Sequence, residues 1–129
     1  MIVREMTPDD IEKLRKIHDE YYSNDFDFPN FTYHFLNTFV VTDDRDNIIS
    51  ASGIRPILEI ITITDKKHSS RLRYKALMQT LNVAQFITSR ERFNNLHAFI
   101  QDKTWREHLI RKGFGPTKGD AIIIGVSNG

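Results

Sequence analysis

The chain contains no cysteine. Disulfide bonds, thiolate nucleophiles and zinc or iron–sulfur sites built on cysteine are therefore excluded. The chain also lacks an excess of one charge, since 18 lysines and arginines stand against 17 aspartates and glutamates. Proteins that hold nucleic acid through its phosphates usually carry a clear basic excess. We therefore expect no nucleic-acid partner.

Long hydrophobic runs are missing as well. The longest apolar stretches, around Ile57–Ile63 and Ala121–Val126, are far shorter than the roughly 20 residues that a membrane-spanning helix needs. The first residues, Met1–Thr7, show no basic segment followed by an apolar run, so no signal peptide is expected. These absences predict a cytoplasmic protein with no membrane partner.

Metal-ligand spacing is also absent. The five histidines are isolated from one another and from grouped carboxylates, so no metal site is expected. What the chain does contain is enough apolar material for a core, because 40% of its 129 residues are hydrophobic and nine are phenylalanine. A chain of this length is expected to form one domain, residues 1–129.

The N-terminal part predicts a strand followed by a helix. Ile2–Met6 alternates apolar and polar residues, as a half-buried strand does. Thr7 is a suitable N-cap, Pro8 suits the first helical position, and two aspartates face the positive end of the helix dipole. Apolar residues then recur at helical spacing up to about Tyr22.

The segment Ser23–Phe35 interleaves turn-forming residues with aromatic ones and predicts an aromatic-rich loop. Two interpretations stay open at this point. The rings pack onto the core, as aromatic side chains commonly do, or they line a surface for a ligand or a partner.

The central part predicts strands. Thr38–Thr42 and Ile48–Ile54 flank the polar turn Asp43–Asn47 and should form a hairpin. Leu58–Thr64 is rich in β-branched residues and almost continuously apolar, as a central strand is. The polar loop Asp65–Ser70 then leads into a long helix.

The C-terminal half predicts two helices and two strands. Ser69 or Ser70 should cap the long helix, whose core face carries Leu77, Leu81, Ala84 and Thr88. Leu96–Ile100 is expected to be a strand. Thr104 and Glu107 have the spacing of a capping box, and Gly113 is placed to end that last helix. Ala121–Val126 is expected to be a final strand.

The order of these elements, β-α-loop-β-β-β-α-β-α-β, resembles the layout of the GNAT superfamily of N-acetyltransferases. The segment Trp105–Phe114 is similar to the family's last helix, which ends in an aliphatic-rich turn and a Gly-Phe pair. The likeness covers nearly the whole chain, with the family's second helix shortened or missing. It implies an α/β (α+β) fold with a mixed, mostly antiparallel sheet, in which Leu58–Thr64 and Leu96–Ile100 form a splayed parallel pair flanked by helices.

The resemblance also implies a reaction, the transfer of an acetyl group from acetyl-CoA to a primary amine of a small molecule or a protein. In the family the pantetheine arm pairs with the fourth strand, and the pyrophosphate sits on the N-terminus of the next helix, where free N–H groups favour an anion. The family's two loop glycines fall here on Leu72 and Tyr74, and its leading Arg or Gln falls on Ser69. The implied acetyl-CoA-binding residues are Ile63, Thr64, Lys66, Lys67, Ser69, Ser70, Arg71, Leu72, Arg73, Tyr74 and Asp102.

Proton transfer departs from the family as well. Many members carry a tyrosine four residues before the Gly of Gly-Phe, where it protonates the CoA thiolate, but this chain has Leu109 there. His108 is adjacent, about 100° further round the helix. Glu59 lies where relatives often carry a carboxylate that removes a proton from the amine. The implied catalytic residues are therefore Glu59 and His108.

The lost glycines and the lost tyrosine favour a second hypothesis from another class. The chain would then be a GNAT-fold binding or structural module without chemistry. Small GNAT-like chains with few motifs look like those encoded by bacteriophages, so this hypothesis includes an assembly partner and a place in the virion. The two hypotheses differ in whether acetyl-CoA binds.

Overall fold

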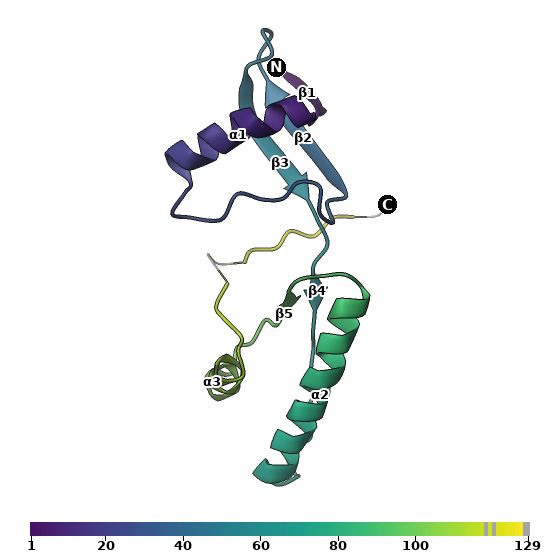
Figure 1. The fold of residues 1–129 in the computed structure, drawn as a ribbon. Coiled ribbons are helices and arrows are strands. Elements are labelled where there is room, and N and C mark those ends of the chain that lie inside the picture. The colour runs from purple at the N-terminus through teal and green to yellow at the C-terminus, as the bar shows by residue number, and fades with distance from the viewer. Residues whose placement is uncertain (118, 120, 128–129) are drawn as a thin grey trace. The chain divides into compact units, whose positions relative to one another are not determined.

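The computed structural model describes residues 1–117, 119 and 121–127 and contains both helices and strands. Their bounds, in chain order, are β1 (Ile2–Glu5), α1 (Pro8–Tyr21), β2 (Asn37–Thr42), β3 (Ile48–Ile54), β4 (Leu58–Glu59), α2 (Ser70–Arg90), β5 (Leu96–His97) and α3 (Lys103–Arg111) (Figure 1). The chain divides into two compact units, Met1–Arg55 with Glu107–Gly129, and Pro56–Arg106. That all 129 residues form one domain remains a prediction.

The first unit holds a three-stranded antiparallel sheet in the order β1-β2-β3. Val3 pairs with Val41, and Val40 pairs with Ala51, so β2 is the central strand. The turn between β2 and β3 is held by the Asp43 carboxylate, which accepts hydrogen bonds of 2.9 Å from the N–H groups of Arg45 and Asn47. The predicted hairpin is confirmed.

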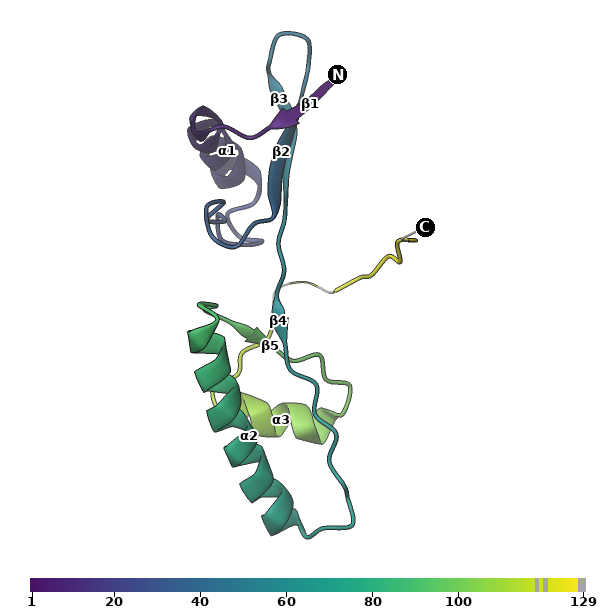
Figure 2. The same cartoon turned by 90° about the vertical axis from the view of Figure 1, so that its right-hand side faces the viewer.

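Helix α1 lies across one face of this sheet (Figures 1 and 2). Alternate residues of β2 share a face, and two of them, Val40 and Thr42, are 0% and 1% exposed. On α1 the buried side chains are one and two turns apart, at Asp10, Leu14 and His18. The core of the first unit therefore sits between α1 and the central strand.

A buried ion pair ties the start of α1 to β1. Arg4 donates two hydrogen bonds to the Asp10 carboxylate, of 2.8 and 2.9 Å. The N–H and hydroxyl groups of Thr7 donate to the same carboxylate at 2.7 and 3.1 Å. These donors, Arg4 above all, hold the pKa of the Asp10 carboxyl well below its usual range. Asp10 thus caps the helix and anchors it to the sheet.

The aromatic loop packs mainly onto the first unit's core. Phe28, Phe31 and Phe35 are half-buried, with ring centroids 5.7 and 5.4 Å apart in that order. The His18 ring lies 5.5 Å from Phe28. This geometry favours the packing interpretation for these rings, while Phe26 of the same loop is exposed.

Gly53 on β3 is required by one of these rings. A β-carbon added there would overlap the Phe35 ring at two of its carbons. We expect Gly53→Ala to lower the free energy of unfolding by about 1–3 kcal/mol, because the ring must leave its packed position. Gly115→Ala is the control, since nothing lies within 4 Å of its added β-carbon. Urea denaturation measures both, and equal stabilities would contradict the packing of Phe35.

The second unit is built on a parallel pair of strands. Leu58 pairs with Leu96 and Glu59 with His97, and the N–H of Ile60 donates to the His97 carbonyl at 2.9 Å. The predicted parallel neighbours are confirmed, but both strands are shorter than expected. Among the residues that the structure describes, they form a sheet separate from β1-β2-β3.

Helix α2 contacts β5 and buries the expected face. Leu77, Leu81 and Ala84 are its buried residues. The Ser69 hydroxyl accepts a 3.2 Å hydrogen bond from the N–H of Leu72, so Ser69 is the N-cap. The sequence left Ser69 and Ser70 as alternatives, and the geometry selects the first.

The predicted start of α3 is wrong. The Asp102 carboxylate accepts from the N–H of Trp105 at 2.9 Å, and its carbonyl accepts from Arg106 at 3.0 Å. Asp102 is therefore the N-cap, and Thr104 lies inside the first turn, where it cannot form a capping box with Glu107. The predicted end is correct, because Gly113 has a φ of +104°, which glycine adopts at no steric cost.

This correction predicts a difference between two alanine substitutions. Asp102→Ala should lower stability by about 1 kcal/mol, as the loss of a helix cap does. Thr104→Ala should leave it within about 0.5 kcal/mol of the native value, as is usual at exposed sites. Chemical denaturation of both variants checks this. A larger loss of stability in Thr104→Ala than in Asp102→Ala would indicate that Thr104 is the N-cap.

The expected final strand is also wrong. Residues 121–127 have no strand in the described structure, and Ile122, Ile123 and Ile124 are 88% exposed or more. β-Branched residues favour a strand only where a neighbouring backbone pairs with them. No described strand pairs with this segment.

Candidate functional site

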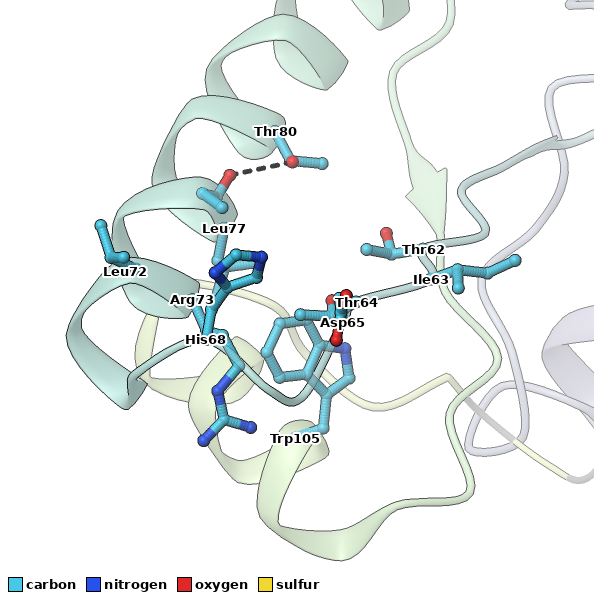
Figure 3. A pocket seen from close by; sticks show the side chains of 11 residues that line it. Thr62, Ile63, Thr64, Asp65, His68, Leu72, Arg73, Leu77, Thr80 and Trp105 are labelled. Carbon is cyan, nitrogen blue, oxygen red and sulfur yellow. Dashed lines mark hydrogen bonds between the residues drawn. The ribbon is translucent and has the colours of Figure 1, made fainter.

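A cavity of about 310 Å³ lies in the second unit, at the N-terminal half of α2. One wall is the segment that follows β4, a second is the first turns of α2, and a third is the Trp105 side chain at the start of α3 (Figure 3). The lining residues are Thr62, Ile63, Thr64, Asp65, His68, Leu72, Arg73, Ala76, Leu77, Thr80 and Trp105. The cavity thus combines aliphatic and aromatic walls with a few polar groups, as small-molecule sites do.

Four of the residues implied by the family resemblance line this cavity, namely Ile63, Thr64, Leu72 and Arg73. Ser69 caps α2 beside them. The other residues of the loop and first turn do not line it: Lys66, Lys67, Ser70, Arg71 and Tyr74. The extended segment and the helix start therefore meet at one place, as the sequence suggested.

Arg73 is the most informative residue of the wall. It is half-buried, and one Nη donates to the Ser70 hydroxyl at 3.2 Å. Its Nε is buried and has no hydrogen-bond partner in the described part of the chain. A buried donor without a partner costs free energy. An anion bound in the cavity would interact with the Arg73 guanidinium through its positive charge.

The other polar groups of the wall are Asp65 and His68. The Asp65 carboxylate accepts from the Lys67 N–H at 3.0 Å and lies 3.4 Å from the Lys67 ammonium. His68 directly precedes the N-cap Ser69 and is exposed to solvent. In Figure 3 its ring lies on the α2 side, across from Thr62 and Asp65.

The residues implied for catalysis lie elsewhere. Glu59 is exposed on β4 opposite His97. His108 is half-buried in the last turn of α3, next to the buried Leu109. Neither lines the cavity. Asp102 does not line it either, and its carboxylate is used as the cap of α3.

Sequence reasoning gave no ligand role to seven of the eleven lining residues, among them Asp65, His68 and Trp105. A signal was present for His68, since the residue before a helix N-cap lies beside the free N–H groups of the first turn. Trp105 is the chain's single tryptophan, and its position at a helix start suggested only packing. Asp65 begins the polar loop after the expected strand, and nothing in the sequence indicated that an aspartate there would line a cavity.

Within residues 1–117, 119 and 121–127, no three histidine, aspartate or glutamate side chains lie close enough together to hold an ion. Over the same residues, none of the helices has the length and apolar character needed to cross a bilayer.

Comparison of the chain with protein-family models, with curated proteins and with solved structures gives no match.

Proposed function

We propose that this chain binds an acyl-CoA in the α2 cavity and transfers the acyl group to a primary amine, as the GNAT N-acetyltransferases do. The observation that carries the proposal is the Arg73 side chain, a cation that lines the cavity beside the N-terminus of α2. Its guanidinium charge would attract a phosphate of the CoA pyrophosphate, and the helix dipole favours the same charge.

The rest of the ligand fits the walls by chemistry. Thr62–Thr64 borders the cavity, and no described backbone group pairs with these residues, so a pantetheine amide has donors and acceptors available. Leu77 and the Trp105 indole give the acyl end an apolar surface. At this end of the cavity the transferred acyl group would be shielded from water.

The phosphates would be held by side chains more than by backbone. The family's glycines let the backbone approach the phosphates closely, but Leu72 and Tyr74 replace them in α2. Lys66 and Arg71 are exposed around the same helix start and add positive charge to that of Arg73. Acyl-CoA binding by this chain is therefore weak and strongly dependent on salt.

A binding or structural module is the second candidate function. It is favoured by the placement of Glu59 and His108 away from the cavity and by Leu109 at the family's tyrosine position. Under this hypothesis the chain binds an assembly partner, in the cytoplasm or in a virion, and its cavity catalyses no reaction.

The Trp105 fluorescence separates the two candidates. Trp105 is the single tryptophan and lines the cavity, so its emission reports directly on occupancy. Titration with acetyl-CoA at low salt should change the emission in a saturable way, and a panel of primary amines should then release CoA thiol. No fluorescence change would contradict the proposed ligand and favour the module, and saturable binding without thiol release would contradict acyl transfer to the amines tested. The variant Trp105→Phe is the control for signal from elsewhere.

A further inference from the structure

We propose that the C-terminal end of α1 is a docking surface for an arginine-rich segment of a partner protein. Three exposed aromatic side chains, Tyr21, Tyr22 and Phe26, form this aromatic patch. The proposal does not depend on acyl transfer, because the patch belongs to the first unit and the cavity residues belong to the second.

The three rings of the patch are exposed and lie next to one another. Tyr21, Tyr22 and Phe26 are 67%, 45% and 42% exposed. The centroid of the Tyr22 ring lies 6.4 Å from that of Tyr21 and 5.5 Å from that of Phe26. Single exposed apolar side chains are ordinary, whereas adjoining ones mark interaction sites. The aromatic loop therefore packs some of its rings onto the core and contributes another to a surface.

Hydrogen bonds hold the patch in one conformation. The N–H of Tyr22 donates to the His18 carbonyl at 2.7 Å, where α1 ends, and the N–H groups of Asp25 and Phe26 donate to the Tyr22 carbonyl at 3.0 and 3.3 Å. The buried His18 ring donates through Nε2 to the Phe26 carbonyl, and its centroid lies 5.1 Å from that of the Phe26 ring. The rings are thus in place before a partner arrives, which lowers the entropic cost of binding.

The charge around the patch indicates a cationic partner. From Ile17 to Asp44 the chain contains no lysine and no arginine, although its net charge as a whole is +1. The Asp19 carboxylate lies 3.6 Å from His18 Nδ1. Complementary charge selects the partner of a surface, and four exposed acidic residues accompany the rings, namely Asp19, Glu20, Asp25 and Asp27.

The chain's own arginines show how such a partner would bind. The Arg15 guanidinium lies 4.5 Å from the centroid of the Phe28 ring, and that of Arg55 lies 5.4 Å from the Phe35 centroid. Phe28 packs on the same His18 ring as the patch does. Arginine suits such contacts better than lysine, because its planar guanidinium is weakly hydrated and stacks on aromatic faces. An arginine-rich segment therefore fits the patch better than a lysine-rich one.

The test measures how a fluorescently labelled octa-arginine peptide binds to the native protein, by fluorescence anisotropy at low salt. We expect saturable binding that weakens as salt is raised. Octa-lysine carries the same charge, and it should bind about three-fold less tightly or weaker still, because its ammonium groups stack poorly on the rings.

Variants of the rings test the patch directly. Tyr21→Ala combined with Tyr22→Ala should weaken octa-arginine binding by about five-fold or more, through the loss of two cation–π contacts. Phe86→Ala combined with Phe99→Ala removes two exposed rings of the second unit and should change the affinity less than about two-fold. Circular dichroism checks that each variant is folded. Tyr21→Leu combined with Tyr22→Leu keeps apolar side chains and should lose the preference for arginine over lysine.

Variants of the carboxylates test the charge. Glu20→Gln combined with Asp25→Asn should weaken octa-arginine binding by about two-fold or more, since each exposed ion pair contributes modestly. Asp44→Asn combined with Glu91→Gln removes the same charge at the turn between β2 and β3 and after α2. This control pair should leave the affinity nearly unchanged.

The outcomes that contradict the proposal are distinct. If the patch variants and their controls weaken binding equally, or octa-lysine binds as tightly as octa-arginine, the attraction is a general effect of charge and the proposal is wrong. If the native protein self-associates and the double tyrosine variant does not, a second copy of the chain covers the patch instead. Absence of octa-arginine binding at low salt would also overturn the proposal, and none of these results bears on the acyl-CoA cavity.

Discussion

Asp10→Ala should lower the free energy of unfolding by about 1–3 kcal/mol, since the Thr7 N–H and one side of the Arg4 guanidinium lose their acceptor, while Arg4 keeps its 2.9 Å ion pair with Asp46. The Asp10 side chain is 2% exposed and receives hydrogen bonds from both Arg4 and Thr7. Its loss removes the cap of α1 and the link from that helix to β1. Chemical denaturation followed by far-ultraviolet circular dichroism measures the effect.

Asp9→Ala is the matched control. Asp9 lies in the same first turn but is exposed, and its loss should cost about 0.3–1 kcal/mol through the helix dipole alone. Equal stabilities of the two single aspartate variants would contradict the role of the ion pair.

The same carboxylate makes stability depend on pH. Because the pKa of Asp10 is lower in the folded than in the unfolded state, its contribution is complete above the unfolded value of about 3.9 and is lost as the pH falls below it. The stability difference between the native protein and Asp10→Asn should therefore shrink between about pH 5 and pH 2. A difference that stays constant over this range would show that the charge is not what matters.

Arg71→Ala combined with Arg73→Ala should weaken acyl-CoA binding, because both remove positive charge at the start of α2. Arg73 lines the cavity, Arg71 is exposed beside it, and a hydrogen bond to a charged donor contributes about 1.5–3 kcal/mol. We expect at least a ten-fold loss of affinity, which corresponds to about 1.4 kcal/mol. The Trp105 fluorescence titration measures it, and Tyr74→Gly should improve binding by letting the phosphates approach the backbone.

The control removes the same charge elsewhere. Arg45→Ala combined with Arg90→Ala changes the net charge equally, at the turn between β2 and β3 and at the end of α2. If this pair weakens acetyl-CoA binding as much as the Arg71 and Arg73 pair, the attraction is a general effect of charge. Tight binding that is indifferent to salt would contradict the proposed arrangement of the loop.

Much of the fold could be predicted because local chemistry determines it. The cap Ser69 and the closing Gly113 act through backbone groups within a few residues, and their roles follow from residue type and spacing. Thr7 stands at the N-cap of α1 as predicted, but there the Asp10 carboxylate accepts the hydrogen bonds and the Thr7 hydroxyl donates one of them. The hairpin follows from a polar turn between two apolar runs. The start of α3 was mispredicted because Thr104 and Asp102 are both good caps, and only geometry chooses between them.

The final strand and the length of β4 could not be predicted, because a strand exists only with a paired neighbour. Ala121–Val126 has the composition of a strand but no described partner. The sequence predicted that the start of α2 belongs to the site. It could not predict the rest of the cavity wall, because that wall depends on which side chains from separate segments come together. His68 and Trp105 are far apart in sequence, and only their placement makes them neighbours of one cavity.

The most direct test of the account is an amide NMR titration of the native protein with acetyl-CoA at low salt. The account predicts saturable shifts confined to the segment Thr62–Asp65, to the start of α2 from His68 to Arg73, and to the Trp105 indole N–H, all of which reverse when salt is raised. Shifts that gather elsewhere on the chain, or no shifts at low salt, would contradict the claim that the α2 cavity binds an acyl-CoA.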